Sequence, residues 1–342
     1  MGDNVSPSGV EDNSNTMEEQ KTFQNRIDLS GLEASVLGIR LEINKVIVGQ
    51  EEMIDLLIAA LLTDGHVLIE GVPGVAKTLT AKLLSKTVSV GFSRIQFTPD
   101  LMPSDVIGSS VFNAKTSDFE FRRGPIFSNI VLIDEINRAP AKTQSALFES
   151  MEERQVTVDG KTYFLEPPFL VIATQNPVEH EGTYRLPEAQ LDRFLFKIEI
   201  TYPTLEQETK IISDFHSRNN KIDLSQIKNI ISAEELSGYR YKVAQVLVEP
   251  NLMNYIAQIV TQTRNNSSLF LGASPRASLA ILSASKSIAA IRGRDFVTPE
   301  DIKFVTKPVL RHRILLTPEK EMEGITPAEV INQIIEKVEI PR

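Results

Sequence analysis

A glycine-rich segment of the chain has the residue types and the spacing of a phosphate-binding loop. It follows a short apolar run, leads into a stretch with helical spacing, and consists of Gly71, Val72, Pro73, Gly74, Val75, Ala76, Lys77, Thr78 and Leu79. Glycines allow the backbone to approach phosphate closely, and the free N–H groups at a helix N-terminus attract an anion. We expect Lys77 to reach the β- and γ-phosphates of a nucleotide, and the Thr78 hydroxyl to bind Mg²⁺.

Ala76 departs from the general pattern of such loops, which has glycine immediately before the lysine. Alanine is expected to fit only if its φ is negative or if it already lies in the first turn of the helix. The alternative is a glycine- and proline-rich turn that carries a lysine by chance. The preceding strand pattern and the following helical pattern favour a nucleotide site.

Two acids, Asp134 and Glu135, follow the apolar run 130–133, which reads as a strand buried on both faces. The carboxyl end of such a strand is where ligand crevices of α/β sheets form. We expect Asp134 to hold Mg²⁺ and Glu135 to polarise an attacking water. Asn176 ends a further apolar strand, within reach of the γ-phosphate or that water, although an Asn before Pro177 is equally typical of a turn. Loop and acids together predict the two halves of one phosphoryl-transfer site that binds a nucleotide.

The hydrophobic pattern divides the chain into three parts. Residues 1–25 are polar and predict a disordered tail, residues 26–204 alternate strands and helices as in an α/β fold, and residues 205–342 predict an all-helical domain. Two hairpins interrupt the α/β part, one near residues 110–121 and one near 155–165, where Asp159-Gly160 is a strong turn signal.

Composition excludes several classes of protein. The 342 residues carry a formal net charge of -9, which argues against a broadly basic surface that binds nucleic acid. The chain has no cysteine, and therefore neither disulfides nor thiolate metal sites. No apolar run approaches the roughly 18 residues of a membrane span, and the polar residues 1–20 do not resemble a signal peptide. We therefore expect a cytoplasmic protein without a membrane span.

Four segments together resemble the AAA+ ATPases of the MoxR family. They are the loop 71–78, the segment 132–140 (Leu-Ile-Asp-Glu-Ile-Asn-Arg-Ala-Pro), the segment 173–177 (Ala-Thr-Gln-Asn-Pro) and the segment 186–194 (Leu-Pro-Glu-Ala-Gln-Leu-Asp-Arg-Phe). The resemblance extends from about residue 46 to the end of the chain and accommodates alanine at position 76. It implies a P-loop core with a parallel αβα sheet, an all-α lid, and ATP with Mg²⁺ as cofactors.

The resemblance also implies roles that spacing alone does not show. Asn176 would be the sensor-1 residue, and Arg193 an arginine finger for a neighbouring subunit's site. Arg276 would be the sensor-2 arginine, which reaches the nucleotide from the helical lid. The adenine pocket would be lined by Val48, Gly49 and Gln50. Arg185 stands where proline is expected, so that it competes with Arg193 as the finger. The two hairpins would be the helix-2 insert and the pre-sensor-1 hairpin, both facing a central pore.

The family implies a homo-oligomeric ring, expected to be hexameric, that remodels or matures a client protein. Such clients often contain a von Willebrand factor A domain. One alternative is a nucleic-acid motor of the minichromosome-maintenance type, which shares the two hairpins, and another is a nucleotide-switched scaffold with little turnover. Each hairpin tip carries one lysine balanced by an aspartate, whereas tracking of a nucleic-acid backbone favours net positive loops. Protein remodelling is therefore the favoured hypothesis.

Overall fold

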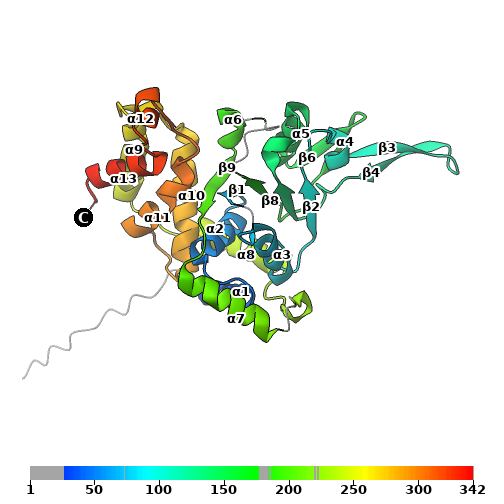
Figure 1. Ribbon diagram of the computed structural model, residues 1–342, viewed down its shortest axis with the longest axis horizontal. Helices are drawn as coiled ribbons and strands as arrows, with labels where there is room; N and C mark the ends of the chain where they lie inside the picture. The colour runs from blue at the N-terminus through cyan, green and yellow to red at the C-terminus, as the bar shows by residue number, and fades with distance from the viewer. Residues whose placement is uncertain are drawn as a thin grey trace, which may run out of the picture.

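A five-stranded parallel sheet forms the centre of the computed structural model (Figure 1). The structure describes residues 27–341 except 73, 177–183, 185, 219, 220 and 222, so that the expected tail and Arg185 lie outside the described residues. In spatial order the strands are β2 (Phe92–Gln96), β5 (Ile130–Asp134), β8 (Leu170–Gln175), β1 (His66–Gly71) and β9 (Phe194–Ile200). The predicted α/β core with a parallel sheet is confirmed.

Alternation along the strands produces two apolar faces, each covered by helices. In β5, Ile130 and Leu132 join one buried cluster, whereas Val131 and Ile133 join the other. Helices α1 (Ser30–Asn44), α2 (Glu51–Leu62) and α3 (Lys77–Thr87) belong to the first cluster, and α4 (Pro103–Ile107) and α5 (Ala141–Glu153) to the second. This arrangement buries the central strands β5, β8 and β1 on both sides, as their continuous apolar runs predict.

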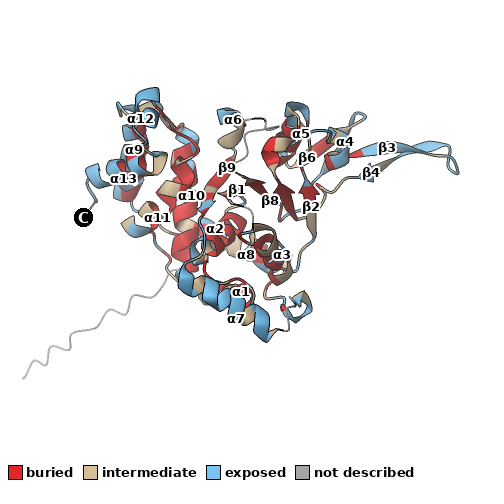
Figure 2. Ribbon diagram, in the orientation of Figure 1, coloured by how far each residue is buried: buried red, intermediate tan, exposed pale blue. Residues whose placement is uncertain are grey.

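Both expected hairpins are present and both extend from the second face of the core. The first pairs β3 (Gly108–Asn113) with β4 (Asp118–Arg123), and the second pairs β6 (Gln155–Val158) with β7 (Lys161–Phe164). The rings of Phe121 and Tyr163 stack at 4.3 Å between centroids and join the two hairpins. Figure 1 shows β3 and β4 projecting far from the sheet, and Figure 2 shows that most of this projection is exposed.

The C-terminal part is mostly helical, as expected. Its longer helices are α7 (Leu205–Ser217), α8 (Ala233–Ala244), α9 (Pro250–Arg264), α10 (Pro275–Ile291), α11 (Pro299–Leu310) and α13 (Pro327–Lys337). Shorter elements are α6 (Glu188–Leu191), α12 (Pro318–Met322), the 3-10 turns η1 (Ile136–Arg138) and η2 (Leu224–Gln226), and the antiparallel pair β10 (Leu269–Leu271) and β11 (Leu315–Leu316). None of the described helices combines the length and the apolar character needed to cross a bilayer.

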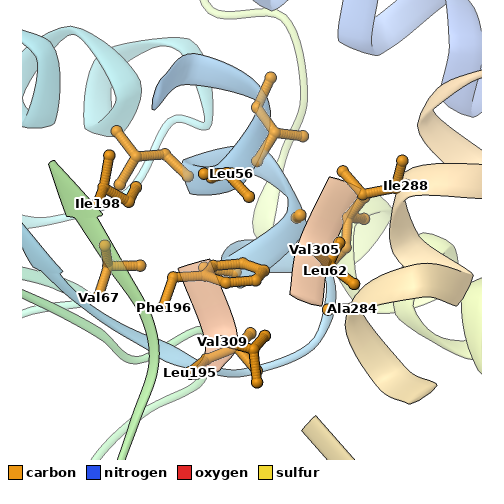
Figure 3. Close-up of a cluster of buried hydrophobic side chains, with 14 of the residues drawn as sticks. Leu56, Leu62, Val67, Leu195, Phe196, Ile198, Ala284, Ile288, Val305 and Val309 are labelled. Carbon is orange, nitrogen blue, oxygen red and sulfur yellow. The ribbon is translucent and has the colours of Figure 1, made fainter. Parts of the chain in front are cut away.

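Core and lid share one buried apolar cluster (Figure 3). Phe196 and Ile198 of β9 belong to this cluster together with Leu56 of α2 on the core side, and with Val309 of α11 and Ile288 of α10 on the lid side. Phe196 has no exposed surface. Because full burial of one such side chain is worth about 1.5–3 kcal/mol, the contact holds the lid firmly against β9.

Candidate active site

The glycine-rich loop connects β1 to α3 at the carboxyl edge of the sheet. Lys77 begins α3, and its Nζ donates a hydrogen bond to the Gly71 carbonyl oxygen at 2.7 Å. The first N–H groups of a helix have no acceptor within it, so those of Lys77, Thr78 and Leu79 are suited to phosphate. Gly71 also allows β9 to approach the loop closely, because a Cβ at this position would lie only 2.9 Å from the Ile200 carbonyl oxygen.

The expectation for Ala76 is wrong. Its φ is 59° and its ψ 18°, a left-handed conformation immediately before α3, which costs an alanine about 1–2 kcal/mol. Hydrogen bonds on both sides hold this conformation. Thr80 donates its N–H and its hydroxyl to the Ala76 carbonyl oxygen at 2.9 and 3.0 Å. Gln50 Nε2 donates to the Val75 carbonyl oxygen at 3.2 Å. A loop fixed from several directions can retain a strained residue.

Thr174 of β8 fixes both acids at the end of β5. Its hydroxyl donates to Asp134 Oδ1 at 3.2 Å and accepts the Glu135 N–H at 3.1 Å. Asp134 is almost fully buried, whereas Glu135 has a left-handed φ of 59° that turns its side chain away from the strand direction. Strain of this kind in a non-glycine residue is common at functional sites.

Two arginines and a glutamine amide contact the carboxylate oxygens of Asp134 and Glu135. Arg94 Nε donates to Asp134 Oδ2 at 2.6 Å, Gln96 Nε2 donates to Glu135 Oε2 at 2.8 Å, and Arg138 Nε lies 3.1 Å from the same Glu135 oxygen. Sequence reasoning missed Arg94 and Gln96, since only the pairing of β2 with β5 brings them to the acids. Arg138, three residues after Glu135 in a short 3-10 turn, could have been suspected from spacing.

The sheet brings the loop and the acids to the same edge, because β1 and β5 both pair in parallel with β8. Burial lowers the pKa of Lys77, and the nearby charges of Asp134, Glu135 and Glu70 oppose this effect. The ammonium group therefore lies within electrostatic reach of both acids. A cation on one side and acids on the other is the arrangement that binds a phosphate together with its metal ion.

Asn176 follows β8 directly, and β8 lies between the strand of the loop and the strand of the acids. The register pairs Ala173 with Ile133 of β5, and Gln175 with Glu70 of β1. Parallel strands end at the same edge of a sheet, so Asn176 lies between the loop and the acids. The backbone position is the one expected for Asn176, and its part in the site stays a prediction.

The turn Val48-Gly49-Gln50 lies beside the loop, joined to it by the bond between Gln50 and Val75. Gln50 Oε1 is buried and has no hydrogen-bond partner within the described part of the chain. Gln207, in the first turn of α7, covers the turn, since a Cβ on Gly49 would lie 2.7 Å from its Nε2. Sequence reasoning missed Gln207, because its capping pattern with Thr204 indicates a helix start but not what that helix covers.

These residues fit a nucleotide with Mg²⁺. The buried Gln50 Oε1 is an acceptor of the kind that the amino group of adenine satisfies. Thr78 and Asp134 offer a hydroxyl and a carboxylate, and Mg²⁺ commonly combines one or two such oxygens with phosphate and water. Arg94 already holds one Asp134 oxygen, so metal binding there competes with an existing ion pair.

Arg193 lies at the opposite edge of the sheet. It immediately precedes β9, whose first residue, Phe194, pairs with His66 at the start of β1. The loop follows the other end of β1, a strand of six residues, and about 3.3 Å per residue separates the two edges by roughly 17 Å. In this arrangement the Arg193 side chain does not face the loop of its own chain.

Arg276 lies beside Arg193 rather than beside the loop. Arg276 Nη2 is 2.9 Å from Glu152 Oε1, and Arg193 Nε is 3.6 Å from Glu152 Oε2. Arg193 Nη1 also donates to the Phe148 carbonyl oxygen at 2.7 Å, and Arg276 Nη1 lies 3.9 Å from Asp192 Oδ2. The two arginines therefore form one cationic group across the contact between core and lid.

Comparisons with known proteins agree with this architecture. Residues 66–196 match the ATPase family associated with various cellular activities (AAA), and residues 261–334 match the AAA lid domain. "Chaperone MoxR1" of Mycobacterium tuberculosis is 45% identical over 310 residues, which cover 88% of this chain and 81% of that protein. "Uncharacterized protein YeaC" of Bacillus subtilis is 48% identical over 299 residues, covering 87% and 92%. The crystal structure of a "putative ATPase" from Cytophaga hutchinsonii has a TM-score of 0.85 and 43% identity, covering 92% and 97%.

Proposed function

Because the chain belongs to the MoxR family of AAA+ ATPases, we propose that it hydrolyses ATP with Mg²⁺ to remodel or mature a partner protein. The observation that carries the catalytic part is that the sheet places Lys77, after β1, and Asp134 and Glu135, at the end of β5, at the same edge. The chaperone part is supported by the relative whose name is Chaperone MoxR1.

Each residue at this edge has a separate task in the proposed reaction. Lys77 leaves the Gly71 carbonyl oxygen and binds the β- and γ-phosphates, and Thr78 and Asp134 bind Mg²⁺. Held by these two residues, the metal ion would supply positive charge that offsets the negative charge of the phosphates. Glu135 accepts a hydrogen bond from the attacking water and aligns it with the γ-phosphate, with Asn176 as a second partner for that water or the phosphate.

The position of the arginines supports a ring. A cation opposite the γ-phosphate accelerates phosphoryl transfer, yet Arg193 and Arg276 lie about one strand length from the loop of their own chain. We therefore propose that both serve the nucleotide of a neighbouring copy, through a heterologous contact that closes into a ring of six. The client would be a protein with a von Willebrand factor A domain.

A nucleic-acid motor is less well supported. The turns of the two hairpins carry Lys115 and Lys161, and Asp118 and Asp159 lie beside them. Phosphate tracking depends on a local excess of positive charge, which these tips lack. A scaffold with little turnover is less well supported, because a protein that only binds nucleotide has no need for a second acid, Glu135, directly after Asp134 at the end of β5.

Two variants test the catalytic assignment. Lys77→Ala removes the cation for the phosphates and is expected to abolish binding of a fluorescent ATP analogue. Glu135→Gln keeps the shape of the site but removes the base, so it should bind the analogue normally and hydrolyse ATP at least about 100-fold more slowly. Turnover by Glu135→Gln equal to that of the parent chain would contradict the role of Glu135.

The ring is tested by ATP turnover per protomer across a protein dilution series, for the parent chain and for Arg193→Ala. We expect the parent's specific activity to rise with protein concentration, because assembly completes the site. The specific activity of Arg193→Ala should be roughly 10³-fold lower than that of the parent at every concentration if the arginine acts as a finger. Constant activity in the parent and parental activity in the variant would contradict completion of the site between subunits.

A further inference from the structure

The two arginines at the far edge of the sheet share a single carboxylate. Glu152 lies in the last turn of α5 in the core, Arg193 precedes β9, and Arg276 lies in the first turn of α10 in the lid. One oxygen of Glu152 faces Arg276 and the other faces Arg193. The acid therefore joins three elements that come from distant parts of the sequence.

We propose that Glu152 is a positioning residue, which holds Arg193 and Arg276 side by side so that both reach the γ-phosphate of a nucleotide bound by a neighbouring copy. This inference rests on the proposed function and adds a residue to it. Glu152 itself need not contact the nucleotide. Its effect is to fix the relative position of two cations.

The physical need for such a residue follows from charge and flexibility. Two guanidinium groups repel each other, and each long side chain loses about 2 kcal/mol of rotamer entropy when it is fixed. A carboxylate between them offsets the repulsion and fixes both side chains before the phosphate arrives. The side chains of Arg193 and Arg276 remain 31% and 49% exposed, so the groups that Glu152 orients are still accessible to a ligand.

The backbone beside Arg193 is held independently of Glu152. The buried Arg313 donates from Nε to Asp192 Oδ1 and from Nη2 to the Phe194 carbonyl oxygen, both at 2.7 Å. These bonds fix the segment on either side of Arg193. Without the Glu152 carboxylate, Arg193 keeps its bond to the Phe148 carbonyl oxygen and Arg276 keeps its longer contact with Asp192, but the link between the two arginines is lost. The fold should be retained, which makes this position suitable for substitution.

Helix α5 provides a matched control. Glu149 lies one turn before Glu152, and both residues border a shallow depression of about 270 Å³ beside Arg193. It forms no ion pair within the described part of the chain. Glu149→Ala removes the same charge from the same helix face but leaves both arginine contacts intact.

Steady-state kinetics at a protein concentration that saturates assembly gives the first test. Misplaced catalytic groups cost up to about 100-fold in rate, so Glu152→Ala should lower kcat by 10- to 100-fold and leave KM within about threefold. Glu149→Ala should keep kcat within about twofold of the parent. Glu152→Asp retains the charge on a shorter side chain and should recover part of the loss. A kcat of Glu152→Ala within twofold of the parent overturns the proposal.

Mixed assemblies separate action on the neighbour from action within one chain. Glu152→Ala has an intact phosphate loop, and Lys77→Ala has intact arginines, so an interface between them combines two intact halves. Random mixing makes about a quarter of the interfaces productive, and activity should rise above the sum of the two separate variants. A mixture of Arg193→Ala with Lys77→Ala should recover in the same way.

The outcomes distinguish this inference from the proposed function. If activity recovers in the mixture of Arg193→Ala with Lys77→Ala but not in the mixture of Glu152→Ala with Lys77→Ala, the positioning role is overturned and the proposed ring is retained. Recovery by neither mixture overturns both, because the inference requires arginines that act on a neighbour. Absence of ATP turnover in the parent chain would overturn the proposed function itself.

Discussion

The stability of this protein should depend on the protonation of His66, the first residue of the strand that carries the phosphate loop. The Val171 N–H donates to Nδ1 at 3.0 Å, so this nitrogen is unprotonated and Nε2 donates to the Met151 carbonyl oxygen at 3.2 Å. Burial, assisted by the positive charge of Arg154, lowers the pKa of His66 from 6.5 to about 3. Both ring nitrogens are thus used by the neutral form.

The direction and size of the effect follow from linkage. Between pH 6.5 and pH 3 the unfolded chain binds a proton at this residue and the folded chain does not, so stability falls as the pH falls. The loss relative to pH 8 is about 2 kcal/mol at pH 5 and approaches roughly 5 kcal/mol near pH 3. Most of the effect at pH 5 comes from the unfolded chain, which has the ordinary histidine pKa.

Urea unfolding followed by circular dichroism at pH 8 and pH 5 measures this loss. His66→Asn is the comparison variant, because its amide oxygen can still accept the Val171 N–H but does not titrate. Burial also lowers the pKa of His312, and this contribution is present in both chains and cancels. The parent should lose about 2 kcal/mol more than the variant between the two pH values. An equal loss in both chains would refute the assignment.

Two further substitutions probe the site through single contacts. Thr174→Val removes the hydroxyl that binds Asp134 and the Glu135 N–H, and should cost about 1–3 kcal/mol of stability. It should also lower kcat about tenfold with little change in ATP affinity, as measured by kinetics and nucleotide titration. Gly71→Ala places a Cβ 2.9 Å from the Ile200 carbonyl oxygen, so we expect about 1–3 kcal/mol of destabilisation and weaker ATP binding. Parental unfolding and affinity in Gly71→Ala would show that β9 moves aside freely.

The parts of the fold that the sequence predicted correctly are those with local signals. The strands of the loop and of the acids are short apolar runs, and both hairpins alternate around clear turn residues. Within the helical part, single helices have weak signals in the sequence, and α8, for example, buries only Leu236 and Val243, too few residues for an apolar stripe. The pair β10 and β11 was missed because five residues in two short strands give no periodicity.

The residues at the centre of the candidate site could be predicted from the sequence, whereas the side chains that contact them could not. Lys77, Asp134 and Glu135 belong to contiguous motifs, whereas Arg94 and Gln96 reach the acids only through the order of strands in the sheet. The expected backbone conformation of Ala76 was wrong because hydrogen bonds from Thr80 to Ala76 and from Gln50 to Val75 hold the loop. The intrinsic φ preference of alanine does not decide it.

Strand β9 gives the molecule a mechanical property. Its first residue adjoins Arg193, and its last residue, Ile200, lies against Gly71 of the same chain's phosphate loop. A strand that is hydrogen-bonded to β1 along its length and packed beneath the lid resists stretching, so it behaves as a short rigid element (a strut). In a closed ring, such struts would lie between each nucleotide and the next. A displacement at one site would then reach the following site along a single rigid element, without any rearrangement of the sheet.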